Sequence, residues 1–246
     1  MKIIDNTKQY FVANKQLGVA GYFADWTTWE KWWGIIATLA IGIASILTWD
    51  VTNQLASWLA IISGITGIWC VLLVAKKRIS NYIFGLVNVI AYAWAAYLWH
   101  IYGDFMLNAF YFLPMQFVGW YYWTKPKVMD GVDKVAVKKL TWQTSLLTIV
   151  GAGIAVFGYK FVLTAMGGNT PLLDATSTVF SVIAMIYMLM RLREQWILWI
   201  IVNVATVLIW LFICFRVEGG MVNFGMLIMW LAWTINSGYG YFNWKD

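Results

Sequence analysis

RISNYIFGLVN at residues 78–88 and REQWILWIIVN at residues 193–203 are two versions of one stretch, placed 115 residues apart. Three side chains coincide in this alignment, pairing Arg78 with Arg193, Val87 with Val202 and Asn88 with Asn203. The same register continues further along the chain, with Met106 on Met221 and Asn108 on Asn223. Apolar segments resemble one another by composition, but identities at Arg and Asn are harder to obtain that way. The alignment therefore indicates an internal repeat.

The composition around these stretches is that of a membrane protein. Of the 246 residues, 62% are hydrophobic and 11% are charged, and the mean hydropathy is +0.70. This is more apolar surface than one soluble core requires. Because lipid offers no hydrogen-bond partner to the backbone, each spanning segment should be an α-helix. The fold class expected is an all-α polytopic membrane protein.

Apolar stretches close to 20 residues, the length of a helix that crosses the hydrocarbon layer, predict eight transmembrane helices. They lie near residues 32–49, 53–75, 79–101, 105–123, 141–163, 171–190, 194–214 and 219–242. A repeat that spans four helices leaves both copies with the same orientation, as in transporters with parallel repeats. This predicts two three-helix bundles joined by a linker helix (3+1+3), plus one extra N-terminal helix. The expected parts are 1–52 (N-terminal segment and extra helix), 53–123 (first bundle), 124–165 (cytoplasmic loop and linker helix) and 166–246 (second bundle).

The charged residues predict the orientation. The net charge of +6 lies in short clusters and forms no basic face, which argues against a nucleic-acid partner. Lys76, Lys77 and Arg78 follow the second span, and Arg191 and Arg193 follow the sixth, whereas the connections after the first and third spans contain no Lys or Arg. By the positive-inside rule both termini are expected in the cytoplasm.

Trp196, Trp199 and Asn203 stand at positions i, i+3 and i+7, so they share one stripe of a helix. An aromatic belt at the membrane interface would explain the two tryptophans. It would not explain Asn203, which lies about 10 Å deeper along the helix axis. A side-chain amide at that depth requires a polar partner on another helix or on a ligand.

Six further polar side chains complete the predicted substrate site. They are Asn88, Asn108, Gln116, Asp174, Asn236 and Tyr239. Interhelical hydrogen bonding is the alternative role for any single amide. Asp174 follows Thr170 and Pro171, which are typical of a helix start, so capping and ligand contact are both open for its carboxylate.

The residue patterns typical of metal sites, nucleotide-binding loops and enzyme active sites are absent from the sequence. The sole histidine is His100, and Cys70 and Cys214 show no metal-ligand spacing. Neither a metal site nor a cofactor is therefore expected. No phosphate-binding loop of the GxxxxGK type occurs, and the spans lack the nucleophile and base constellation that an enzyme requires.

The sequence resembles the PnuC family of bacterial vitamin transporters. The resemblance covers the second to eighth spans and rests on RISNYIFGLVN, IYGD at 101–104, GWYYW at 119–123, Asp174, REQWILWIIVN and NSGY at 236–239. The Trp-x-x-Trp element followed by Asn is the most specific of these. The family is similar to the SWEET sugar transporters in its helix plan, which agrees with the repeat described above.

The resemblance implies transport of nicotinamide riboside, a precursor of NAD, through the bacterial cytoplasmic (inner) membrane. It implies facilitated diffusion with alternating access, followed by phosphorylation by a cytoplasmic kinase that traps the product. It also implies that Trp196, Trp199, Asn203, Asn236 and Tyr239 contribute to substrate binding. The alternative is another vitamin such as thiamine or riboflavin. The expected partners are the small-molecule substrate and the lipid bilayer, and a homo-oligomer is compatible with this plan.

Overall fold

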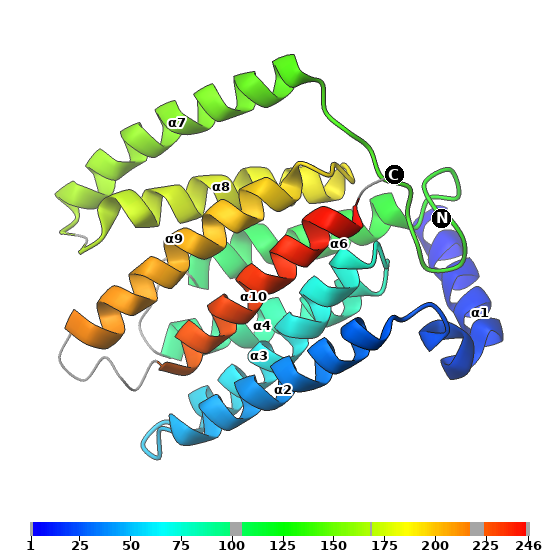
Figure 1. Cartoon of the computed structure of the whole chain (residues 1–246), viewed down its shortest axis with the longest axis horizontal. Helices are drawn as coiled ribbons and strands as arrows, with labels where there is room; N and C mark the ends of the chain where they lie inside the picture. The colour runs from blue at the N-terminus through cyan, green and yellow to red at the C-terminus, as the bar shows by residue number, and fades with distance from the viewer. Residues whose placement is uncertain (1, 99–104, 168, 217–223, 245–246) are drawn as a thin grey trace. The chain divides into compact units, whose positions relative to one another are not determined.

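The computed structural model describes residues 2–98, 105–167, 169–216 and 224–244, and within them every regular element is a helix (Figure 1). The expected all-helical class is thus confirmed for the described residues. The chain divides into two compact units, Met1–Ala136 and Val137–Asp246. Four features of the sequence lie outside the described residues: His100, the IYGD motif, Met221 and Asn223.

The first unit contains α1 (Lys2–Phe23), α2 (Thr28–Leu47), α3 (Gln54–Ala75), α4 (Asn81–Leu98), the π-helix η1 (Leu107–Phe112) and α6 (Leu113–Trp123). Neighbours in the chain pack together, α2 on α3, α3 on α4 and α4 on α6. Helix α1 was not predicted from the sequence. Polar residues interrupt its apolar ones throughout, so it contains no long apolar run.

The second unit contains α7 (Trp142–Ala165), α8 (Pro171–Leu189), α9 (Gln195–Arg216) and α10 (Phe224–Asn243). Helix α7 packs on α8, α8 on α9 and α9 on α10. In Figure 1 the last three of these helices, coloured from yellow-green to red, lie side by side. Each unit thus contains a packed series of three helices, α3, α4 and α6 in the first and α8, α9 and α10 in the second, with α2 or α7 packed on the first of the three.

Six described helices are long and apolar enough to cross a membrane, namely α2, α3, α4, α7, α8 and α9. The predicted span at 105–123 is divided at η1, where the Leu113 N–H donates to the Asn108 carbonyl five residues earlier. Pro114 follows and has no N–H to donate, which favours such a widened turn. Helix α10 has polar Asn236 and Ser237 and two nearby glycines within its 20 residues. The eight-span plan therefore stays a prediction.

A tight corner recurs between α3 and α4 and between α8 and α9. Lys77 (φ 61°) and Arg191 (φ 62°) both adopt the left-handed conformation. The next N–H in each unit donates five residues back, from Arg78 to the Leu73 carbonyl and from Leu192 to the Tyr187 carbonyl, each at 2.9 Å. Such bonds satisfy carbonyls that would be unpaired at a helix end. The two left-handed residues are 114 positions apart, not 115.

The predicted repeat register is therefore wrong by one residue at this corner. Arg78 directly follows the left-handed residue Lys77, whereas Arg193 comes two residues after the left-handed residue Arg191. The two arginines that match in the sequence therefore occupy different backbone positions of the corner. Burial agrees with the shift of 114, since the outward-facing Ile83 (42% exposed) then pairs with Ile197 (46% exposed). Asn88 and Asn203 are consequently not equivalent, and Trp196 corresponds to Tyr82.

A buried polar cluster holds α1 and the loop after α6 against the first corner. Asp133 accepts hydrogen bonds from the Tyr10 hydroxyl (2.7 Å), the Ser80 N–H (3.0 Å) and the Ser80 hydroxyl (2.7 Å). The Arg78 guanidinium lies 3.6 Å from the same carboxylate and 2.5 Å from Asp25. Burial raises the pKa of Asp133, and the bonds from Tyr10 and Ser80 oppose that rise. The cluster thus joins three distant parts of the chain.

Candidate functional site

Trp196 is wedged between α9 and α10. Its side chain is 2% exposed, and its ring lies directly over Gly240, where a Cβ atom would stand 2.5 Å from the indole. The Trp244 ring meets it edge-on, with centroids 5.8 Å apart and planes at 76°. Within the described residues the Trp196 indole N–H has no hydrogen-bond partner. This indole is therefore buried inside its unit, which an aromatic belt would not require.

The same arrangement occurs in the first unit. The Tyr82 ring lies against Gly119, and Trp123 meets it edge-on with centroids 5.1 Å apart and planes at 85°. In both units the glycine precedes the buried tryptophan by four residues, so the two lie on one helical face. An aromatic ring in a glycine notch is thus a shared feature of the two units.

Trp199 has different neighbours from Trp196. It is partly buried and packs against a cluster formed by Ala184, Tyr187, Leu192 and Leu198. Two of these residues belong to α8, and Leu192 belongs to the corner before α9. The two indoles of the Trp-x-x-Trp element therefore contact different helices, Trp196 on the side of α10 and Trp199 on the side of α8.

Asn203 joins α9 to α10. Its side chain is 3% exposed, and its amide Nδ2 donates to the Ser237 hydroxyl at 2.8 Å. Asn236, the residue before Ser237, is fully buried, and Tyr239 is half-buried. Asn203, Asn236 and Tyr239 are thus placed along the α9–α10 pair, and Asn203 has the interhelical partner that its depth requires.

We expect Ser237→Ala to lower the free energy of unfolding by about 1–3 kcal/mol, because the buried Asn203 amide loses its acceptor. The measurement is thermal unfolding of the purified protein in detergent. Ser145→Ala on α7 is the matched control, since within the described residues that hydroxyl donates to the carbonyl of Thr141, the N-cap of its own helix, and to no other helix. Equal melting temperatures for the two variants would contradict the prediction.

Asp174 lies in the first turn of α8. Thr170 occupies the N-cap position and Pro171 the first helical position. The Thr170 hydroxyl makes no capping bond and instead donates to the Asp174 carboxylate at 3.0 Å. A carboxylate at this end of a helix also interacts favourably with the helix dipole. Asp174 therefore has a local structural role, which leaves contact with a ligand untested.

Three predicted site residues belong to the first unit. Asn88 on α4 donates to the Ser63 carbonyl of α3 at 2.7 Å. Gln116 on α6 is buried beside Gly85 of α4. Asn108 is buried on the π-helix, a local geometry often found at functional sites. The other six predicted residues belong to the second unit, where all except Asp174 lie on α9 and α10.

Gln195 is a residue that the sequence analysis missed. It is the first residue of α9 and is 0% exposed. Neither its Oε1 nor its Nε2 has a hydrogen-bond partner within the described residues. The signal available in the sequence was its spacing, because Gln195, Leu198 and Trp199 at i, i+3 and i+4 share a buried face.

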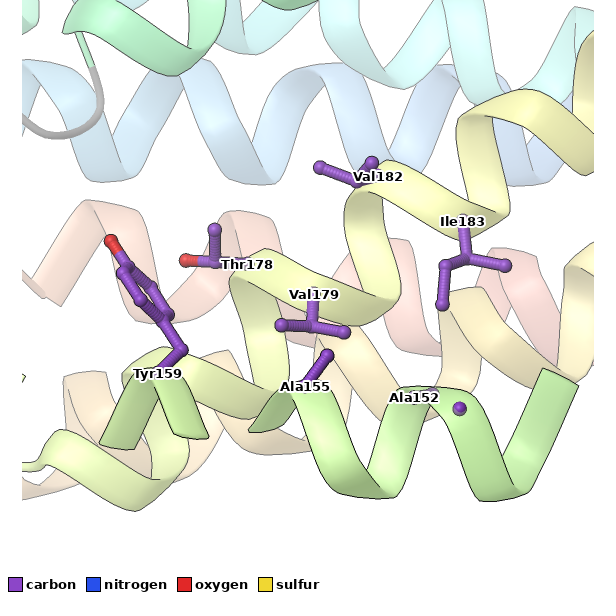
Figure 2. A pocket seen from close by; sticks show the side chains of 8 residues that line it. Ala152, Ala155, Tyr159, Thr178, Val179, Val182 and Ile183 are labelled. Atoms are coloured by element: carbon purple, nitrogen blue, oxygen red, sulfur yellow. The ribbon is translucent and has the colours of Figure 1, made fainter. Parts of the chain in front are cut away.

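Two surface depressions lie away from these residues. The first has a volume of about 410 Å³ and lies between α7 and α8. Figure 2 shows Ala152, Ala155 and Tyr159 of α7 facing Thr178 and Val179 of α8. Its walls are almost entirely apolar. A second depression of about 340 Å³ lies between α1 and the loop after α6 in the first unit. None of the nine predicted site residues lines either one.

Comparison with known proteins adds the following matches. The model of a family described as nicotinamide mononucleotide transporter matches residues 57–246. A protein of Neisseria mucosa named nicotinamide riboside transporter PnuC is 36% identical over 225 residues, which cover 90% of this chain and 82% of the relative. A protein of the same name from Haemophilus influenzae is 34% identical over 224 residues, covering 91% and 92%. A solved structure described as the crystal structure of the vitamin B3 transporter PnuC has a TM-score of 0.72 at 34% identity, covering 91% of this chain and 93% of that one.

Proposed function

Because the chain belongs to the nicotinamide mononucleotide transporter family, we propose that it carries nicotinamide riboside through the bacterial cytoplasmic membrane. The observation that carries the proposal is the α9–α10 pair, where indoles and neutral amides are buried together. Transport is by facilitated diffusion with alternating access. We further propose eight spans in the 3+1+3 plan with an extra N-terminal helix, and both termini in the cytoplasm.

The chemistry of this pair of helices suits the substrate. Nicotinamide riboside has a cationic pyridinium ring, a carboxamide and ribose hydroxyls. A cation against the face of Trp196 or Trp199 gains about 0.5–2 kcal/mol, depending on how far it is desolvated. Asn203, Asn236 and Tyr239 supply donors and acceptors for the carboxamide and the sugar. We propose these five residues as the core of the substrate site, with Asp174, Asn88, Asn108 and Gln116 as further members.

A phosphorylated substrate fits this site less well than the riboside. Phosphate sites usually contain Arg or Lys, and the predicted spans hold no cluster of them. Lys76 and Arg78, at the corner after α3, already pair with the buried Glu30 and with Asp25. Phosphorylation by a cytoplasmic kinase would therefore trap the product inside the cell.

Thiamine is the second candidate, because it also contains a flat cationic heterocycle that an indole face would attract. Riboflavin is flat but uncharged, so the cation–π term would be absent. Competition by each vitamin against labelled nicotinamide riboside ranks the three. We expect nicotinamide riboside first and thiamine second.

Purified protein in liposomes tests the proposed function. We expect labelled nicotinamide riboside to equilibrate across the bilayer without ATP or an ion gradient, and nicotinamide mononucleotide to equilibrate at least about tenfold more slowly, because its phosphate loses hydration without a cationic partner. Protein-free liposomes are the control. Uptake that requires a proton or sodium gradient would contradict facilitated diffusion, and equal rates for both compounds would contradict selection against phosphate.

A further inference from the structure

The side-chain amide of Gln195 is buried without a hydrogen bond, within the described residues, that would explain its burial. The side chain is completely buried at the start of α9, and both polar atoms are without partners within the described residues. Buried polar groups in proteins are almost always hydrogen-bonded, so an exception calls for a physical reason. A ligand that occupies this place in another state of the protein is one such reason.

The corresponding residue of the first unit provides a direct comparison. With the shift of 114 residues, Gln195 corresponds to Asn81, which is also completely buried. Asn81 Nδ2 donates to the Arg78 carbonyl of its own corner at 2.6 Å, whereas Asn81 Oδ1 has no partner within the described residues. Gln195 follows a corner with the same backbone bonds yet makes no such contact. The amide N–H is therefore bonded to the corner in the first unit, whereas both polar atoms of the amide are unpaired in the second, the unit with Trp196 and Trp199.

Gln195 also lies next to the proposed aromatic contacts. It directly precedes Trp196, and Trp199 follows one helical turn later on the same face, about 5–6 Å away along the axis. The carboxamide of nicotinamide lies at the edge of the pyridinium ring. A ring held against the Trp199 indole can thus extend its carboxamide toward the first turn of α9.

We propose that Gln195 recognises the primary carboxamide of the substrate through two hydrogen bonds. Nε2 donates to the carboxamide oxygen, and Oε1 accepts from the carboxamide N–H. Both unpaired atoms of the glutamine would be satisfied together. A carboxylate in place of the carboxamide has no N–H to donate and places negative charge against Oε1. Gln195 is therefore a specificity-determining residue for the amide over the acid, an inference that rests on the proposed function.

The test uses analogues that differ only at this group. We expect wild-type protein to bind nicotinamide riboside at least about tenfold more tightly than 3-acetylpyridine riboside, in which a methyl group replaces the amide nitrogen. Nicotinic acid riboside should bind more weakly still. Gln195→Met has similar length and no polar group, and we expect it to bring the first two affinities within about threefold of each other. The affinities come from competition against labelled nicotinamide riboside.

Asn81→Met is the matched control, because it removes the corresponding amide where that amide has a structural bond. We expect it to leave the ratio of the two affinities unchanged, whatever its effect on stability. A ratio unchanged in Gln195→Met, or a wild-type protein that does not distinguish the two analogues, would overturn the assignment. The wild-type comparison applies even if the variant does not fold. Failure of the wild-type protein to bind nicotinamide riboside at all would instead overturn the proposed function.

Discussion

Asp133→Ala is expected to lower the free energy of unfolding by about 3–5 kcal/mol, because it breaks a buried charged cluster. Three donors from Tyr10 and Ser80 lose their acceptor, and the buried Arg78 loses one of its two carboxylate neighbours. Asp133 lies in the loop after α6, so the same change removes the side-chain bonds that join Tyr10 of α1 and this loop to Ser80 at the corner between α3 and α4, while the backbone bonds of the loop to Lys77 and Ile79 remain. The measurement is thermal unfolding in detergent.

Asp130→Ala is the matched control for this prediction. Asp130 lies three residues earlier in the same loop and its side chain is exposed, so its loss should change the unfolding free energy by no more than about 0.5 kcal/mol. Asp133→Asn keeps one acceptor oxygen and removes the charge, and we expect a loss smaller than that of the alanine variant. Similar stabilities for Asp133→Ala and Asp130→Ala would show that the cluster contributes little.

The predicted spans agree with the structure where the membrane itself sets the helix length. The predictions at 53–75, 171–190 and 194–214 correspond to α3, α8 and α9 within two residues at every end. These helices need an apolar run long enough to cross the hydrocarbon layer, and that run is visible in the sequence. Helix α2 begins four residues earlier than predicted, because Thr27 and Glu30 form a capping box ahead of the apolar run.

Features that depend on contacts between distant residues were not visible in the sequence. Helix α1 is held by the bond from Tyr10 to Asp133, 123 residues away, and no local pattern indicates such a pair. The repeat register failed for a related reason. Letter identity aligned Arg78 with Arg193, whereas the backbone aligns the left-handed residues Lys77 and Arg191, and neither of these is a glycine that would have marked the turn.

The sequence predicted which residues of α9 share one face, but not which neighbouring helix each of them contacts. Helical spacing put Trp196, Trp199 and Asn203 on one stripe, and the structure buries the first and last of these against α10. Positions i and i+3 differ by about 60° around a helix, which is enough for Trp199 to contact α8 instead. Which neighbour each side chain meets depends on how the helices pack, and one helix pattern does not contain that information.

Gly240→Ala is expected to abolish most binding of nicotinamide riboside by displacing Trp196. A Cβ atom at Gly240 would lie 2.5 Å from the Trp196 ring, well inside van der Waals contact, and the Trp244 ring already packs edge-on against the same indole. Overpacking of this kind costs about 1–3 kcal/mol. The indole must leave its position to avoid it, so we expect affinity to fall at least about tenfold, as measured by competition against labelled substrate.

Gly238→Ala is the matched control, because it makes the same substitution on α10 without a contact to Trp196. Gly238 lies on the same helix two residues earlier, and a Cβ atom there would meet nothing within 4 Å. Alanine is also the better helix former, by about 1 kcal/mol, so this variant should bind substrate like wild type and melt no lower. Because both variants add one methyl group to α10, a difference between them reports the contact with Trp196 alone. If Gly240→Ala bound substrate as well as Gly238→Ala, the position of the Trp196 ring would not matter for binding, and the α9–α10 pair would lose its central role in the proposed site.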